Sequence, residues 1–150
     1  MSPADTLARL RRFLLGFSVM LFGGTLFELF LIEHTDSLVQ LIPFVLCGVG
    51  TLASLAALFR PRRATMLALR AGMGLIVLGS LFGIYEHVSN NFAIKREVDP
   101  GAETRALLLS ALGGANPLLA PGMLAVASVL ALAATYRNPA LRTNSEAEGD

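Results

Sequence analysis

Four long apolar segments alternate with short polar ones along the chain. The apolar segments cover residues 13–32, 38–59, 66–88 and 117–136. Each is close to the roughly 20 residues that an α-helix needs to cross a hydrocarbon core about 30 Å thick. Helices are expected because unpaired backbone groups are costly in lipid. The pattern predicts an all-α fold, an integral membrane bundle of four transmembrane helices within one domain, 13–141.

The polar segments are expected to be small accessory elements. Residues 1–12 read as an amphipathic segment at the inner surface, and the acidic end, 142–150, as a disordered tail. The longest connection, 89–116, contains a leucine-rich stretch at 103–112 that is expected to lie on the outer leaflet as an interfacial helix. None of these segments is long enough for a soluble catalytic domain. Any site is therefore expected inside the bundle, at its outer rim or against a partner protein.

Composition supports lipid as the solvent of this chain. Hydrophobic residues make up 54% of it and charged residues 15%, against roughly 25% charged residues in soluble domains. The single cysteine, Cys47, excludes an internal disulfide and a thiolate metal cluster. Its expected role is that of a small buried hydrophobic residue.

The basic residues predict the orientation. Nine of the twelve lie on one side of the predicted membrane: Arg9, Arg11, Arg12, Arg60, Arg62, Arg63, Arg70, Arg137 and Arg142. The positive-inside rule places this side, with both termini, in the cytoplasm. We therefore expect a multi-pass protein of a bacterial cytoplasmic membrane. A basic start before an apolar run also occurs in cleaved signal peptides, but the length of this run and its Glu28 favour a retained first helix.

One polar pair occurs twice. Glu33-His34 ends the first predicted span and Glu86-His87 ends the third, at the same predicted depth. An even number of spans separates the copies, so they are compatible with two parallel helix-hairpin repeats. Imidazole and carboxylate groups are good ligands for transition metals, and two histidines from two helices also suit a haem. The four residues are therefore a candidate metal or haem site, although Glu-His at a helix end is equally a common way to leave the membrane.

Helical geometry gives both histidines an expected direction. Steps of three and four residues back from His34 reach Gly23 and Gly16, and such steps from His87 reach Gly83. Small residues allow membrane helices to approach one another closely. Both imidazoles are therefore expected to face the bundle interior near the outer surface.

Glu28 is a separate candidate. It lies six residues, roughly 9 Å of helix, inside His34. An intramembrane acid is costly and is a functional candidate by default. The alternative is a protonated carboxyl bonded to a hydroxyl, and the candidate partners are Thr25, Ser54 and Ser80.

Two family resemblances follow from these residues. Four short spans with one acid, Glu28, in the first resemble the small multidrug-resistance transporters, in which that acid exchanges protons for cationic drugs. This resemblance implies a small proton-coupled transporter. Several stretches also resemble hypothetical four-span bacterial membrane proteins: Gln40-Leu41-Ile42-Pro43, Tyr85-Glu86-His87, Leu119-Ala120-Pro121-Gly122 and Tyr136-Arg137-Asn138-Pro139. That resemblance implies the same four-span topology.

The remaining patterns favour a protein that works by association. The glycine pairs lack the strand context of a phosphate-binding loop, and no serine, histidine and acid are arranged as in a hydrolase. Lipid headgroups account for the inner arginines, so nucleic acid is not an expected partner. We expect a non-enzymatic accessory subunit or binding protein of a membrane complex, whose partners are the lipid bilayer and other membrane helices, including further copies of itself. A metal- or haem-binding protein and a transporter that uses Glu28 are the alternatives.

Overall fold

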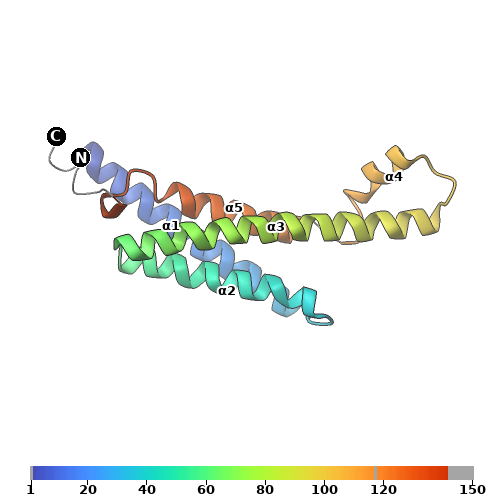
Figure 1. Cartoon of the computed structure of the whole chain (residues 1–150), viewed down its shortest axis with the longest axis horizontal. Helices are drawn as coiled ribbons and strands as arrows, with labels where there is room; N and C mark the ends of the chain where they lie inside the picture. The colour runs from blue at the N-terminus through green and yellow to red at the C-terminus, as the bar shows by residue number, and fades with distance from the viewer. Residues whose placement is uncertain (1, 117, 142–150) are drawn as a thin grey trace.

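All regular secondary structure in the described part of the chain is helical. The computed structural model describes residues 2–116 and 118–141. Its elements in chain order are α1 (Pro3–Leu31), α2 (Leu38–Phe59), α3 (Arg63–Val98), α4 (Thr104–Ala111), α5 (Leu119–Ala133) and a short 3-10 turn, η1 (Pro139–Leu141) (Figure 1). The first residue of the predicted fourth span and the predicted acidic tail lie outside the described residues.

Three of the helices suit a membrane. α1, α2 and α3 are each long and apolar enough to cross one. α5 is also apolar but has only 15 residues, which corresponds to about 22 Å of helix. The prediction of an all-helical fold is confirmed, three helices could span a membrane, and α5 is shorter than the fourth span expected at 117–136.

The start of α1 and the end of α3 differ from those expected. Ser2 caps α1, because its hydroxyl accepts a bond from the Asp5 amide at 3.1 Å and the Asp5 carboxylate accepts one from the Ser2 amide at 3.2 Å. From Pro3 onward, the segment expected to be a separate amphipathic piece is thus the first part of α1. α3 continues to Val98 instead of ending at residue 88, and α4 occupies the place of the expected interfacial helix.

Two helix pairs, α1 with α2 and α3 with α5, make up the body of the molecule. α1 packs against α2 and α5, and α3 packs against the same two helices. The N-terminus, the α2–α3 connection and η1 lie at one end, and the α1–α2 connection lies toward the other (Figure 1). α3 extends beyond its neighbours there, and α4 folds back on this extension. Toward that end, α2 and the end of α1 diverge from α3 (Figure 1).

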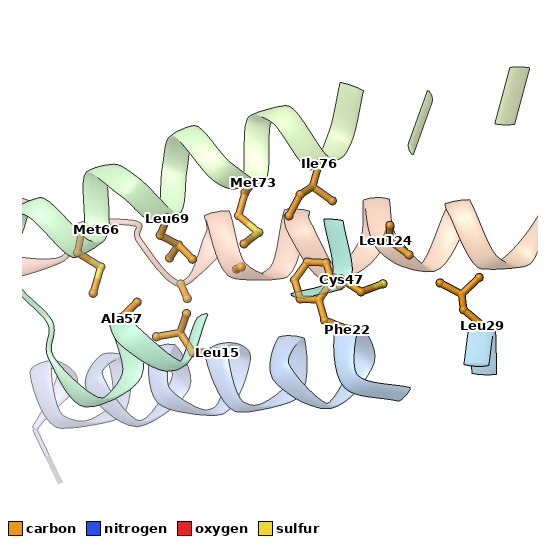
Figure 2. Close-up of a cluster of buried hydrophobic side chains, with 13 residues drawn as sticks. Leu15, Phe22, Leu29, Cys47, Ala57, Met66, Leu69, Met73, Ile76 and Leu124 are labelled. Carbon is orange, nitrogen blue, oxygen red and sulfur yellow. The ribbon is translucent and has the colours of Figure 1, made fainter. Parts of the chain in front are cut away.

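The hydrophobic core lies between the helices in the half of the molecule near the termini. Figure 2 shows side chains from α1, α2, α3 and α5 meeting there. Phe22 is fully buried at its centre, and a Cβ atom added at Gly50 would come within 2.8 Å of three atoms of the Phe22 ring. Cys47 is buried and free, as expected. α1 and α2 therefore approach closely because residue 50 has no side chain.

The buried serines do not cross-link the helices. Ser18, Ser80 and Ser128 each donate to the carbonyl four residues earlier in their own helix, at 2.8 Å. Such bonds satisfy a hydroxyl locally in an apolar environment. Within the core, these three serines therefore leave helix association to close packing.

Two arginines hold the chain just beyond α5. Arg11 of α1 donates from Nε to the carbonyl of Tyr136 at 3.0 Å and from Nη2 to that of Arg137 at 2.6 Å. Arg70 of α3 donates from Nε to the Thr135 hydroxyl at 2.9 Å. Cations near a helix C-terminus complement its unpaired carbonyls and its dipole. The terminal end of the molecule is thus tied together by basic residues.

Candidate functional site

A cavity of about 570 Å³ lies between the four long helices at the end away from the termini. Its size is within the range usual for small-molecule sites, about 300 to 1,000 Å³. Leu29 and Leu124 belong both to its wall and to the hydrophobic core, so the cavity begins where the core ends. The divergence of the helix pairs at this end provides the space.

The charged groups of the cavity are all acids or histidines. The described lining residues include Glu28 from α1, His34 from the α1–α2 connection, and Glu86 and His87 from α3, but no lysine or arginine. Uncharged polar lining residues are Thr25, Ser37, Gln40, Ser80, Asn90 and Asn116. The other lining residues are apolar or glycine, so the site combines an apolar wall with a polar and acidic one.

The end of α1 turns His34 toward the cavity. Glu33 has φ 52°, in the left-handed region, its amide donates to the carbonyl of Phe30 at 3.2 Å, and the His34 amide donates to that of Leu29 at 3.1 Å. These two bonds form a Schellman motif, in which glycine is the usual residue at the position of Glu33. His34 therefore lines the cavity, whereas the exposed Glu33 does not.

The two imidazoles affect one another. Burial lowers the pKa of His34, the neighbouring His87 lowers it further, and Asp36 acts in the opposite direction. His34 is accordingly neutral at neutral pH. On His87, Nδ1 is buried and has no hydrogen-bond partner among the described residues.

The two carboxylates of the cavity lie on different helices. Glu86 is half-buried on α3, whereas Glu28 is exposed on α1. Glu28 has no hydrogen bond to Thr25, Ser54 or Ser80: the Ser80 hydroxyl is engaged by its own helix, and the Ser54 hydroxyl has no partner within the described ranges. The carboxyl of Glu28 is therefore accessible from the cavity.

The structure brings three of the four candidate metal-site residues to one cavity. In the part of the chain that the structure describes, no three histidine, cysteine or acidic side chains come close enough to hold a metal ion. The two Glu-His pairs also differ in setting, because Glu33-His34 follows the end of α1 while Glu86-His87 lies well inside α3. The cavity gathers His34, Glu86 and His87, together with Glu28, but leaves Glu33 outside.

The expected helical stripe is correct for α3 and wrong for α1. On α3, Ile76 and Ser80 are buried on the stripe that leads to His87. On α1, the stripe through Gly16 and Gly23 leads to Phe27, which is 64% exposed. The buried face of α1 consists of Leu15, Ser18, Phe22, Thr25 and Leu29. His34 reaches the cavity through the turn after α1, not along a helical face.

Asn91 is a buried residue that the sequence analysis did not single out. Its Nδ2 donates to the carbonyls of Ala111 and Asn116, both at 2.9 Å, and its Oδ1 accepts from the Asn116 amide at 2.9 Å. Asn91 is only 1% exposed. The available signal is the pair Asn90-Asn91 soon after an apolar span, because a buried amide is retained only with its bonds satisfied.

The candidate site is thus an acidic, partly apolar cavity assembled from all four long helices. Its polar wall comes mainly from α1, α3 and the two connections that follow α1 and α4. Searches with family models, among curated proteins and among solved structures gave no match to this chain.

Proposed function

We propose that this chain is a four-span protein of a bacterial cytoplasmic membrane, with both termini inside, and that its cavity opens outward and binds a small organic cation. The single observation that carries the proposal is the composition of the cavity wall: two carboxylates, two histidines and no lysine or arginine among the described lining residues. The chain then acts as a binding protein, alone or as the accessory subunit of a membrane complex.

The arrangement of α5 supports a fourth span. α5 packs on α1 and α3, from the cavity to the residues that Arg11 and Arg70 bind. Ala134 and Thr135, which follow α5, are also buried. The packed segment is therefore longer than the helix itself, and the helices beside it are long enough to span a membrane.

The distribution of charge supports the orientation. The arginines of α1, of the α2–α3 connection and of the start of α3 lie toward the end that carries the start of α1 and η1 (Figure 1). The positive-inside rule assigns that end to the cytoplasm. The cavity lies at the opposite end, so its polar wall faces the outside.

The chemistry of the wall favours a cation with an apolar part. Leu29, Leu46 and Leu124 offer apolar contacts at the core side, whereas Glu28 and Glu86 provide negative charge. Charge interactions are stronger in a partly buried site than in bulk water. A positively charged ligand is therefore favoured over a neutral or anionic one of the same shape.

The packed inner half favours binding over transport. Phe22, Leu69 and Met73 are fully buried between the cavity and the terminal end. Passage of a ligand would require this core to open. Proton-coupled transport remains the second candidate because the accessible carboxyl of Glu28 lines the cavity, and it predicts flux of the cation across a sealed vesicle membrane.

The test uses two ligands of equal shape. Benzyltrimethylammonium and its uncharged isostere neopentylbenzene are titrated into the purified protein in lipid nanodiscs. We expect the cation to bind more tightly, and Glu28→Gln or Glu86→Gln to weaken its binding about tenfold each. Glu97→Gln is the matched control, because Glu97 is exposed on α3 and does not line the cavity.

Two results would contradict the proposal, and a third would favour the transporter. Equal affinity for the cation and the isostere, or equal effects of all three glutamine variants, contradicts the proposal. Uptake of benzyltrimethylammonium into proteoliposomes, driven by a proton gradient and lost in Glu28→Gln, would instead favour the transporter.

A further inference from the structure

The connection between α4 and α5 contributes one polar residue to the cavity wall, and a buried side chain holds the backbone of this residue. Asn116 lines the cavity, and both its backbone amide and its carbonyl are bonded to the side chain of Asn91 at 2.9 Å. A third bond from Asn91 holds the carbonyl of Ala111. One buried carboxamide therefore fixes both ends of the segment 111–116.

Gly114 is part of the same arrangement. A Cβ atom at residue 114 would collide with the carboxamide of Asn91. The segment can thus pass over Asn91 only because residue 114 has no side chain. The backbone of Asn116 is bonded to Asn91, whereas its own carboxamide has no hydrogen-bond partner among the described residues, and Asn116 lines the cavity.

We propose that Asn116 is a ligand-contacting residue of the cavity and that Asn91 is its positioning residue. That Asn116 contacts a ligand rests on the proposed binding function, whereas the placement of Asn116 rests on the three hydrogen bonds of the Asn91 side chain alone. The carboxamide of Asn116 adds a neutral donor and acceptor to a wall whose charged groups are Glu28 and Glu86.

The test is thiol labelling at position 116. Asn116→Cys is made with Cys47→Ala, and its backbone retains both bonds to Asn91. Two methanethiosulfonate reagents are compared, one carrying a trimethylammonium group and one a sulfonate. Acidic clefts concentrate cations, so we expect the ratio of cation to anion labelling rates to be about tenfold higher at 116 than at Ala115→Cys, an exposed neighbour outside the cavity.

The three hydrogen bonds of the Asn91 side chain form a clamp on residues 111–116. Breaking this clamp should remove the difference in labelling ratio between positions 116 and 115. Asn91→Ala in the Asn116→Cys background is expected to reduce the ratio to that of position 115. Gly114→Ala should do the same with Asn91 still present, which covers the case in which Asn91→Ala fails to fold. A ratio at 116 equal to that at 115 with the clamp intact, or a high ratio that survives both variants, overturns the positioning role.

Contact between the ligand and residue 116 is measured separately. Saturating benzyltrimethylammonium should slow labelling at 116 at least about fivefold and leave position 115 unchanged. Binding of this cation to the nanodisc-embedded protein without protection at 116 overturns the contact. Absence of any binding would contradict the proposed function, whereas the labelling ratios would still decide whether Asn91 positions residue 116.

Discussion

Replacing Gly50 with valine is expected to lower the free energy of unfolding by about 3 kcal/mol. A Cβ atom at this position would come within 2.8 Å of three atoms of the Phe22 ring, which is fully buried in the core. The ring cannot move aside without displacing its neighbours, because packed interiors contain few voids. Reversible unfolding in mixed micelles, or the midpoint of thermal unfolding in detergent, measures the loss.

Gly48→Val is the matched control for this prediction. Gly48 lies two residues away on the same helix, and a Cβ atom there would meet nothing within 4 Å. Its replacement should change the free energy of unfolding by no more than about 0.5 kcal/mol. Combining Gly50→Val with Phe22→Ala should give a smaller total loss than the sum of the two single effects, because the neighbours share one contact. Equal losses at positions 48 and 50 would show that the core does not pack as described.

Binding of the organic cation is expected to weaken about tenfold between pH 7.5 and pH 5, because protonation of His34 adds a positive charge to the cavity wall. The charged or titratable groups that face His34 are Glu28 on α1, Glu86 and His87 on α3 and Asp36 in the connection, while the lining residues of α2 and α5 are uncharged. The pKa of His34 is lowered, so this residue stays neutral until the pH falls below 6.5. Its contribution to the loss of affinity therefore develops only below that pH.

The lowered pKa of His34 also affects the stability of the folded chain. With its pKa lowered on folding, His34 binds fewer protons in the folded than in the unfolded chain. Stability is then lost as the pH falls below the unfolded value of 6.5, and the loss levels off below the folded pKa. Acid should both release the cation and loosen this end of the molecule.

Benzyltrimethylammonium suits this measurement because its own charge does not change with pH. The contribution of His34 is isolated with a His34→Gln variant. We expect this variant to lose much of the pH dependence between 7.5 and 5. An identical pH profile in the wild-type protein and in this variant would contradict the role of His34.

Local sequence signals were sufficient for α2. The expected span, 38–59, has the bounds of the helix, Leu38–Phe59. The Ser37 hydroxyl and the Gln40 side chain form a reciprocal cap at its start, and Arg60-Pro61 follows its end. Hydrophobic length and capping act within a few residues, which is why these bounds can be read without knowledge of the fold.

The end of α3 depends on less visible causes than that of α1, which lies at Leu31, one residue from the expected end at 32. α1 ends with a left-handed Glu33 where glycine would have given the usual signal. α3 continues through a polar stretch because its extension packs against α4, with Asn91 bonded to the following segment. The turn after α1 is local, whereas the length of α3 follows from tertiary contacts that hydrophobic periodicity does not encode.

The candidate site was predicted in part. The Glu-His pairs and Glu28 directed attention to the outer rim, and the cavity does contain His34, Glu86, His87 and Glu28. The cavity itself arises from the divergence of two helix pairs, and the wall formed by Asn116 depends on three hydrogen bonds from Asn91. Neither property belongs to any one segment of the sequence.

Single-cysteine labelling in intact bacterial cells tests most directly the central claim, that four helices cross the membrane and present the cavity to the outside. Ser37→Cys, Arg62→Cys and Pro139→Cys, each made with Cys47→Ala, place a thiol at the cavity, in the α2–α3 connection and beyond α5. With a membrane-impermeant maleimide, the account predicts labelling of position 37 in intact cells, and of positions 62 and 139 only after permeabilisation. Labelling of position 139 from outside, or of 62 instead of 37, would contradict it.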